Sequence, residues 1–102
     1  MKKVILTLFF FCLSISLLPA QNWIKACSDL RTTFEQGNYQ KAVMGCEKVV
    51  EAAKDAKASA KISDPIYFNV LTLIGHLYND MGIYHKAEVL LVESLEIIKP
   101  HL

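Results

Sequence analysis

Apolar residues recur at steps of three and four from about residue 23 onward, and this spacing is typical of amphipathic α-helices. Gly37 and Gly82 favour helix ends, because glycine takes the left-handed conformation after a helix without steric cost. Asn38 can cap the helix that follows Gly37, and the pair Asp64-Pro65 favours a helix start. The pattern therefore predicts an all-α fold of two antiparallel helical hairpins, with helices over about Trp23–Gln36, the residues after Asn38, Pro65–Asp80 and Tyr84–Lys99.

The two predicted hairpins repeat each other at a period of 45 residues. The matching pairs are Gly37 and Gly82, Tyr39 and Tyr84, Lys41 and Lys86, Ala42 and Ala87, and Val50 and Leu95. A fixed period is the mark of repeat architecture, in which one hairpin cannot bury its apolar side without a neighbour. The segment Glu51–Asp64 is rich in alanine, lysine and glutamate, so we expect it to lengthen the second helix.

These positions resemble the tetratricopeptide repeat (TPR) family. The second copy carries the family pattern in Leu71, Ile74-Gly75, Tyr78, Gly82, Tyr84, Ala87, Leu91, Ser94-Leu95 and Pro100. The first copy matches only in its second half, through Gly37, Tyr39, Ala42, Cys46 and Val49-Val50. The resemblance implies a short TPR solenoid, in which Gly75 and Ala87 allow close helix approach while Tyr78, Tyr84 and Leu91 fill the space around them.

Two further comparisons refine this resemblance. The 45-residue period also lies in the range of HEAT and armadillo repeats, which remain an alternative, although the glycine-tyrosine turns favour the TPR family. The elongated layout is similar to the repeats of kinesin light chains, and to exported bacterial proteins that place such repeats before a caspase-like CHAT protease domain. The resemblance covers nearly all of the chain after residue 20.

The first 20 residues have the composition of a secretory signal peptide. Two lysines precede an apolar run of 15 residues from Val4 to Leu18, and Ala20 marks the expected cleavage site. The run is shorter than the roughly 20 residues that cross a bilayer, so we expect a secreted or periplasmic protein without a stable membrane anchor. Residues 21–102 would form the repeat domain, with repeats over about 21–62 and 64–100.

The charge balance and the motifs of the sequence limit the partners and activities that we expect. Cleavage after Ala20 leaves nine basic residues against ten acidic ones, so we expect no nucleic acid as a partner. The histidines His76, His85 and His101 are too far apart in sequence for two of them to converge on a metal from adjacent helical turns. No catalytic or phosphate-binding motif is recognisable, so we expect no enzyme activity, no cofactor and no metal.

Cys27 and Cys46 leave two alternatives open. A disulfide between them is chemically allowed in an oxidising compartment. The TPR resemblance instead implies that Cys27 points to the ligand groove while Cys46 packs inward as a small apolar residue.

The TPR resemblance also implies a ligand groove on the concave face, formed by the first helix of each hairpin. Counting from Gly75 and its counterpart Leu30, the groove positions are Ile24, Cys27, Arg31, Phe34 and Glu35 in the first repeat and Asn69, Thr72, His76, Asn79 and Asp80 in the second. An extended or helical peptide would pack there on an aromatic ring and bond to amide, guanidinium and imidazole groups. The predicted partner-binding residues are Arg31, Phe34, Asn69, Thr72, His76 and Asn79.

The last predicted helix has no polar capping helix after it, although terminal repeats need one. We therefore expect an apolar surface on this helix, formed by Val89, Leu90, Val92 and Ile97. Our first hypothesis is an exported interaction module that binds a peptide or protein partner, and a separate hypothesis is a structural homodimer through the uncapped helix. The alternative is the N-terminal repeat region of a larger enzyme, such as a CHAT-type protease.

Overall fold

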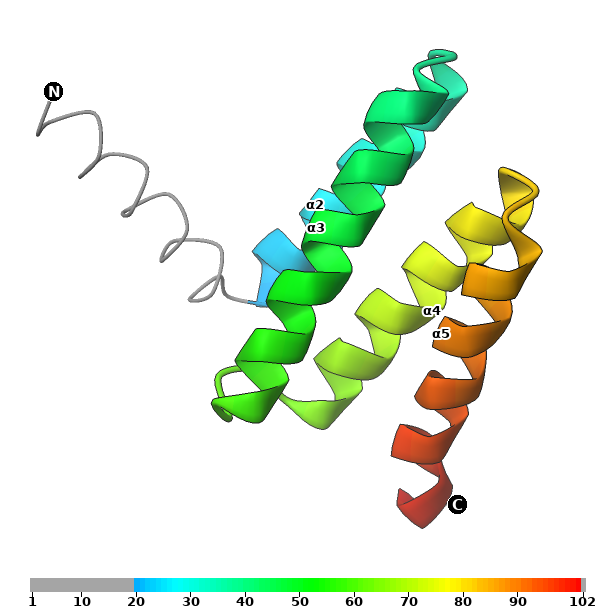
Figure 1. Ribbon diagram of the computed structural model, residues 1–102. Helices are drawn as coiled ribbons and strands as arrows, with labels where there is room; N and C mark the ends of the chain where they lie inside the picture. Colours follow the sequence, from blue (N-terminus) through cyan, green and yellow to red (C-terminus); the bar gives the residue numbers. More distant parts are fainter. Residues whose placement is uncertain (1–19, 102) are drawn as a thin grey trace, which may run out of the picture.

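The structure is a computed structural model that describes residues 20–101, and every regular element in this range is helical. The elements are α2 (Ala20–Glu35), α3 (Tyr39–Ala58), α4 (Asp64–Asp80), α5 (Tyr84–Ile98) and the 3-10 turn η1 (Lys99–His101), shown in Figure 1. The predicted all-α class is confirmed. The predicted signal peptide lies outside the described residues, apart from Ala20.

The helix boundaries agree with the sequence pattern except after α3. The lysine- and alanine-rich segment lengthens α3 to 20 residues, as expected, but the helix ends at Ala58, and residues 59–63 form a turn. Neither predicted cap makes the expected bond. The Asn38 side chain makes no capping hydrogen bond, and Ser63 stands at the N-cap of α4 while Asp64 pairs with Lys57 of α3.

All three turns between consecutive helices close with the same pair of backbone hydrogen bonds. In the first turn, the Gly37 N–H donates to the Phe34 carbonyl (2.9 Å) and the Asn38 N–H donates to the Thr33 carbonyl (3.2 Å). The same pattern recurs at residues 56–61 and 78–83. The residue in the left-handed conformation is Gly37, Ala60 or Gly82, with φ of 85°, 57° and 79° respectively. Local chain chemistry therefore ends each helix in the same way.

The four helices form two antiparallel hairpins, and α4 lies in the middle of the arrangement (Figure 1). α2 packs on α3, α4 packs on α5, and α4 also contacts both helices of the first hairpin. Two exposed ion pairs join the hairpins: Arg31 with Asp80 at 2.9 Å and Lys86 with Glu47 at 2.7 Å. Exposed pairs of this kind contribute about 0–1 kcal/mol each, so apolar packing holds the hairpins together.

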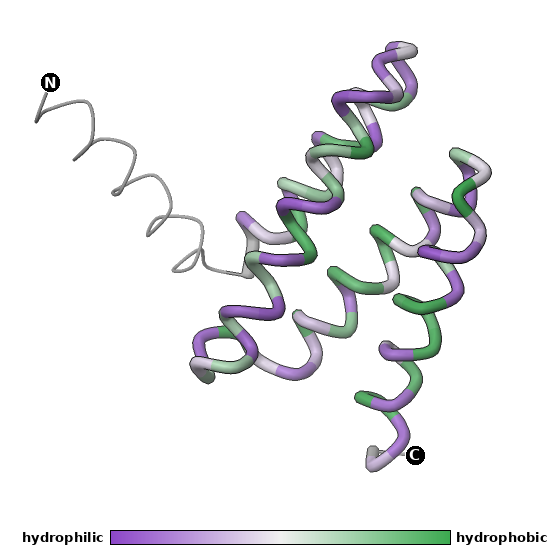
Figure 2. Tube along the Cα trace, viewed as in Figure 1, coloured by the Kyte–Doolittle hydropathy of each residue, from purple (hydrophilic) through white to green (hydrophobic). Residues whose placement is uncertain are grey.

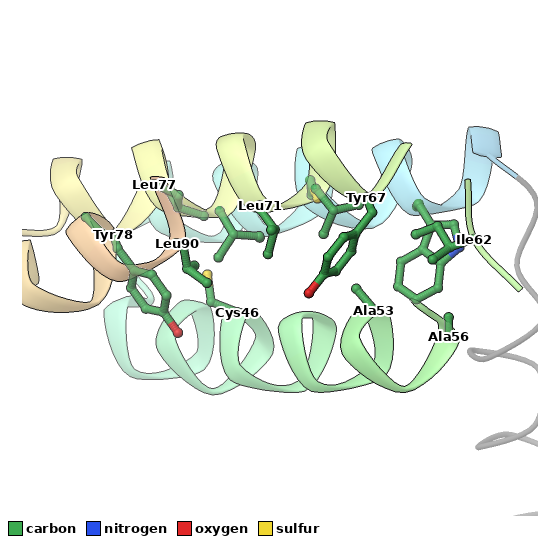
Figure 3. Packing of buried hydrophobic residues seen from close by; sticks show 14 residues of the cluster. Cys46, Ala53, Ala56, Ile62, Tyr67, Leu71, Leu77, Tyr78 and Leu90 are labelled. Atoms are coloured by element: carbon green, nitrogen blue, oxygen red, sulfur yellow. The ribbon is translucent and has the colours of Figure 1, made fainter. Parts of the chain in front are cut away.

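The core lies where α4 meets the first hairpin. The buried side chains of α4 are Tyr67, Val70, Leu71, Ile74, Leu77 and Tyr78. On α3 the buried positions are small, namely Ala42, Cys46, Ala53 and Ala56, which leaves room for the larger residues of α4. Figure 3 shows the Tyr67 ring extending from α4 toward Ala53. Figure 2 shows several green, hydrophobic segments along α4, consistent with its many buried residues.

Two expectations about individual side chains are wrong. Tyr84 was expected to fill space near Gly75 and Ala87, but its side chain is mostly exposed at the start of α5, while Tyr78 is buried as predicted. Leu90 was expected on the open surface of α5, but it is buried next to Cys46 (Figure 3), whereas Val89 and Val92 are exposed. Leu90 belongs to the same buried cluster as Cys46 and the core residues of α4.

Candidate binding groove between α2 and α4

A shallow groove of about 190 Å³ lies between α2 and α4. Its lining residues come from the first helix of each hairpin: Ile24, Cys27, Ser28, Arg31, Leu73 and Leu77. Within α2, Ile24, Ser28 and Arg31 are spaced by four and three residues, so they form one row on the helix surface. The groove is therefore built from one face of each helix and needs no loop to complete it.

The 45-residue period relates the helix rows on which the groove residues lie, but only Ser28 and Leu73 line the groove at corresponding positions. Ile24, Ser28 and Arg31 on α2 correspond to Asn69, Leu73 and His76 on α4. Each wall offers one exposed aliphatic side chain, Ile24 at 37% and Leu73 at 41%, while Leu77 is buried. Exposed aliphatic groups in a concave surface favour contact with an apolar side chain of a partner.

The polar end of the groove is formed by Arg31 and Asp80. Their ion pair of 2.9 Å spans α2 and α4, and both side chains are about half exposed. Arginine has five N–H donors, so Arg31 retains donors for a carbonyl or carboxylate of a ligand while it holds Asp80. His76, also exposed on α4, adds a further hydrogen-bonding group on the same row.

The six predicted partner-binding residues fall into two rows. Of the six, Arg31 lines the groove. Asn69 and His76 are exposed on the row of α4 that contains Leu73 but do not line the groove, and Asn69 borders a separate hollow with Ile97 and Ile98. Phe34, Thr72 and Asn79 belong to a neighbouring row of positions. None of these three lines the groove, although Cys27, the counterpart of Thr72, lies buried on its floor.

Phe34 and Thr72 make contacts within the protein instead of lining the groove. Phe34 is half-buried and packs against the core, with its ring centroid 5.3 Å from that of Tyr39. The Thr72 hydroxyl donates to the Phe68 carbonyl at 2.7 Å, so its donor is already used within α4. Asn79 is exposed near the end of α4.

The predicted groove positions, which were counted from Gly75 and Leu30, did not include Ser28 and Leu73. Both positions lie two residues before Leu30 or Gly75, on rows whose other members the count had selected. The signal that could have found them is the row Asn69, Leu73, His76 and Asp80, spaced by four, three and four residues.

Both described cysteines are buried and free, so no disulfide joins them. Cys27 lines the floor of the groove, but its side chain is covered, contrary to the expectation of a thiol presented to a ligand. Burial raises the pKa of Cys27 to about 12 and that of Cys46 to about 11. Protonated thiols are poor nucleophiles, so Cys27 contributes apolar surface rather than reactivity to the groove.

Residues 20–101 hold neither a metal-binding cluster nor a membrane-spanning helix. Within residues 20–101, no three histidine, cysteine, aspartate or glutamate side chains gather closely enough to hold a metal ion. None of the helices in the same range is both long and apolar enough to cross a membrane.

Comparison of this chain with protein-family models, with curated proteins and with solved structures finds no match.

Proposed function

We propose that this chain is an exported helical-repeat protein of the TPR type that binds a peptide or protein partner in the groove between α2 and α4. The 45-residue period, the glycine turns and the contacts of α4 with both helices of the first hairpin support the repeat assignment. The charged and apolar character of the first 20 residues supports export to the secreted or periplasmic space.

The observation that carries the proposal is the pair of exposed aliphatic residues in the groove. Ile24 and Leu73 come from equivalent faces of α2 and α4, and the Arg31–Asp80 ion pair lies on the same two rows. Isolated exposed aliphatic residues are common on protein surfaces, but two that line one groove together with a guanidinium form a combined apolar and polar site.

This arrangement favours a short segment with an apolar side chain next to a carboxylate or free backbone carbonyls. The apolar side chain would contact Ile24 and Leu73, and the oxygen atoms would accept hydrogen bonds from Arg31. A groove of about 190 Å³ holds one side chain rather than a whole folded surface, so affinity would come from a few residues of the partner.

A peptide-display selection followed by a titration monitored by NMR tests this function. Peptides are selected on the protein as cells process it, with counter-selection on Leu73→Asp, which places a charge in the groove without disturbing the core. The selected peptides should shift the amide signals of residues around Ile24, Arg31, Leu73 and His76. Arg31→Gln should weaken binding about 10-fold or more, because a charge-assisted hydrogen bond is worth about 1.5–3 kcal/mol.

Val92→Asp is the matched control, because it adds the same charge on the exposed face of α5, outside the groove. Peptide binding to this variant should equal that of the wild type. Selection that enriches no peptide over the Leu73→Asp background, or shifts that map to α3 and α5, would exclude the groove as the binding site.

A further inference from the structure

The expected cleavage site of the signal peptide lies at the start of α2. Ala20 is the first residue of this helix, and it is also the residue after which we expect the chain to be cut. The next residue, Gln21, is already helical. Cleavage after Ala20 therefore places a free α-amino group on the first residue of a helix, and that residue is a glutamine.

The side chains that attach α2 to the rest of the protein lie after this cleavage site. Trp23, two residues beyond the new end, is 1% exposed and belongs to the core cluster. Cys27, one turn later on the same face, is buried as well. Asn22, between the new end and the core, is exposed. The new amino group therefore belongs to a helical turn that Trp23 holds against the core.

The charge of this amino group is unfavourable where it stands. An α-amino group is largely protonated at neutral pH, and the start of a helix is the positive end of its dipole. Lys25 places a second positive charge on the next turn, where it is exposed. Within residues 21–28 the sequence has no acidic residue that could offset these charges. Loss of the amino charge would therefore stabilise the first turn of α2.

An N-terminal glutamine can remove this charge by an internal reaction. The neutral α-amino nitrogen attacks Cδ of its own side-chain amide, so that an N–Cδ bond forms and the Cδ–Nε2 bond breaks. Nε2 leaves as ammonia, with the proton that the attacking nitrogen gives up. The product is an uncharged five-membered lactam, pyroglutamate. No helical hydrogen bond is lost, because the first four N–H groups of a helix have no partner within it.

We propose that Gln21 is a modification site and that the mature chain begins with pyroglutamate. The modification requires cleavage after Ala20, so it rests on the export proposed above. It also leaves no free amine for an aminopeptidase, which would otherwise shorten α2 toward Trp23. Ile24, which lines the binding groove, lies three residues after Gln21. The lactam therefore protects the helix that forms one wall of the groove.

Mass spectrometry of the full-length chain, produced in a host that exports it, tests the proposal. The mature protein should have the mass of residues 21–102 less about 17 Da, which is the ammonia lost on cyclisation. Trypsin should release a peptide of residues 21–25, and its fragments should place the loss at the first residue. A chain that begins at Gln21 and keeps its full mass after prolonged incubation would overturn the proposal while leaving export intact. A chain that retains residues 1–20, or begins elsewhere, would overturn both.

Gln21→Ala is the matched control, because it leaves Ala20 in place and cannot form the lactam. Its mature form should have the full mass expected for its residues 21–102. Treatment with an aminopeptidase should shorten this variant toward Trp23 and leave the wild type unchanged. Equal loss of residues from the two proteins would overturn the proposal, because it would show a free amino group on both.

Discussion

Leu30 of α2 occupies the space that a Cβ atom on Gly45 of α3 would fill. In the second hairpin the roles are reversed, because Gly75 on the first helix receives Leu91 from the second. Leu30 and Gly75 are counterparts at the 45-residue period, so the same position carries the large residue in one hairpin and the small one in the other. Each hairpin keeps close helix contact by setting a leucine against a glycine.

Gly75→Ala should destabilise the protein. A Cβ at this buried position would lie 2.9 Å from Cδ2 and 3.0 Å from Cγ of Leu91, so the whole leucine side chain would have to move. Overpacking costs about 1–3 kcal/mol, and the better helix propensity of alanine returns about 1 kcal/mol of this. Urea unfolding followed by the fluorescence of Trp23, the only tryptophan of the chain, measures the change in the free energy of unfolding.

Gly45→Ala is the comparison variant. Only the terminal Cδ2 methyl of Leu30 blocks the added methyl group, since Cγ would lie at 3.5 Å, and Leu30 is half-buried and free to rotate. Its free energy of unfolding should stay within about 1 kcal/mol of the wild type. A Gly75→Ala protein as stable as the Gly45→Ala protein would contradict the distinction between the two contacts.

Ala60→Gly should stabilise the protein. Ala60 has a φ of 57°, a conformation that costs a non-glycine residue about 1–2 kcal/mol, and it occupies the place that glycine holds in the other two turns. Part of the gain is lost to the greater freedom of glycine in the unfolded chain, so an increase of up to about 1 kcal/mol in the free energy of unfolding is expected. Thermal unfolding followed by circular dichroism measures it. Ala58→Gly, in the last turn of α3, should have the opposite effect, and a loss of stability in both variants would contradict the prediction.

Stability should fall as the pH rises above about 9. Burial raises the pKa of Cys27 from 9.0 to about 12, of Cys46 from 9.0 to about 11, and of Tyr78 from 10.0 to about 12. These groups stay protonated in the folded state while the unfolded chain loses their protons, so the unfolded state gains stability as the pH increases. Below pH 9 these groups contribute no pH dependence. Urea midpoints between pH 7 and 11 measure the trend.

The Cys46→Ala variant separates the thiol from other alkaline effects. It lacks one of the titrating groups, so its urea midpoint should decline less steeply between pH 9 and 11 than that of the wild type. Loss of the packing of the Cys46 side chain lowers the urea midpoint of the variant at every pH. The informative quantity is therefore the slope of the urea midpoint against pH. An identical slope in the two proteins would show that Cys46 is not held protonated by the fold.

Tyr67→Phe should lower the free energy of unfolding by about 1 kcal/mol, because a buried tyrosine hydroxyl donates to Glu93 Oε1 at 3.0 Å across α4 and α5. The ring itself remains packed against α3, so the loss reports the hydrogen bond. Tyr84→Phe is the matched control, since that tyrosine is exposed and its change should stay below about 0.5 kcal/mol. Equal effects at the two positions would mean that the Tyr67 bond adds no net stability.

Much of the fold could be predicted because it depends on neighbours in the sequence. The three- and four-residue spacing located all four helices, and Gly37 and Gly82 marked two of the turns. The turn at Ala60 could not be found in the same way, since alanine rarely adopts a positive φ and the surrounding residues are good helix formers. The groove was predicted only in part. The count from Gly75 gives the position of each residue along the helix, but it does not tell which row of residues a neighbouring hairpin covers. Leu73 was therefore not among the predicted groove residues.

The sequence alone therefore determines the all-α class, the approximate limits of the helices and their pairing into two hairpins that repeat at 45 residues. These features arise from backbone hydrogen bonds and apolar spacing within one or two helical turns. The burial of Cys27, the exposure of Leu73 and the fit of Leu30 against Gly45 depend on tertiary structure. Each is set by the rotation of one helix against another, and that rotation results from the packing of side chains that are distant in the sequence.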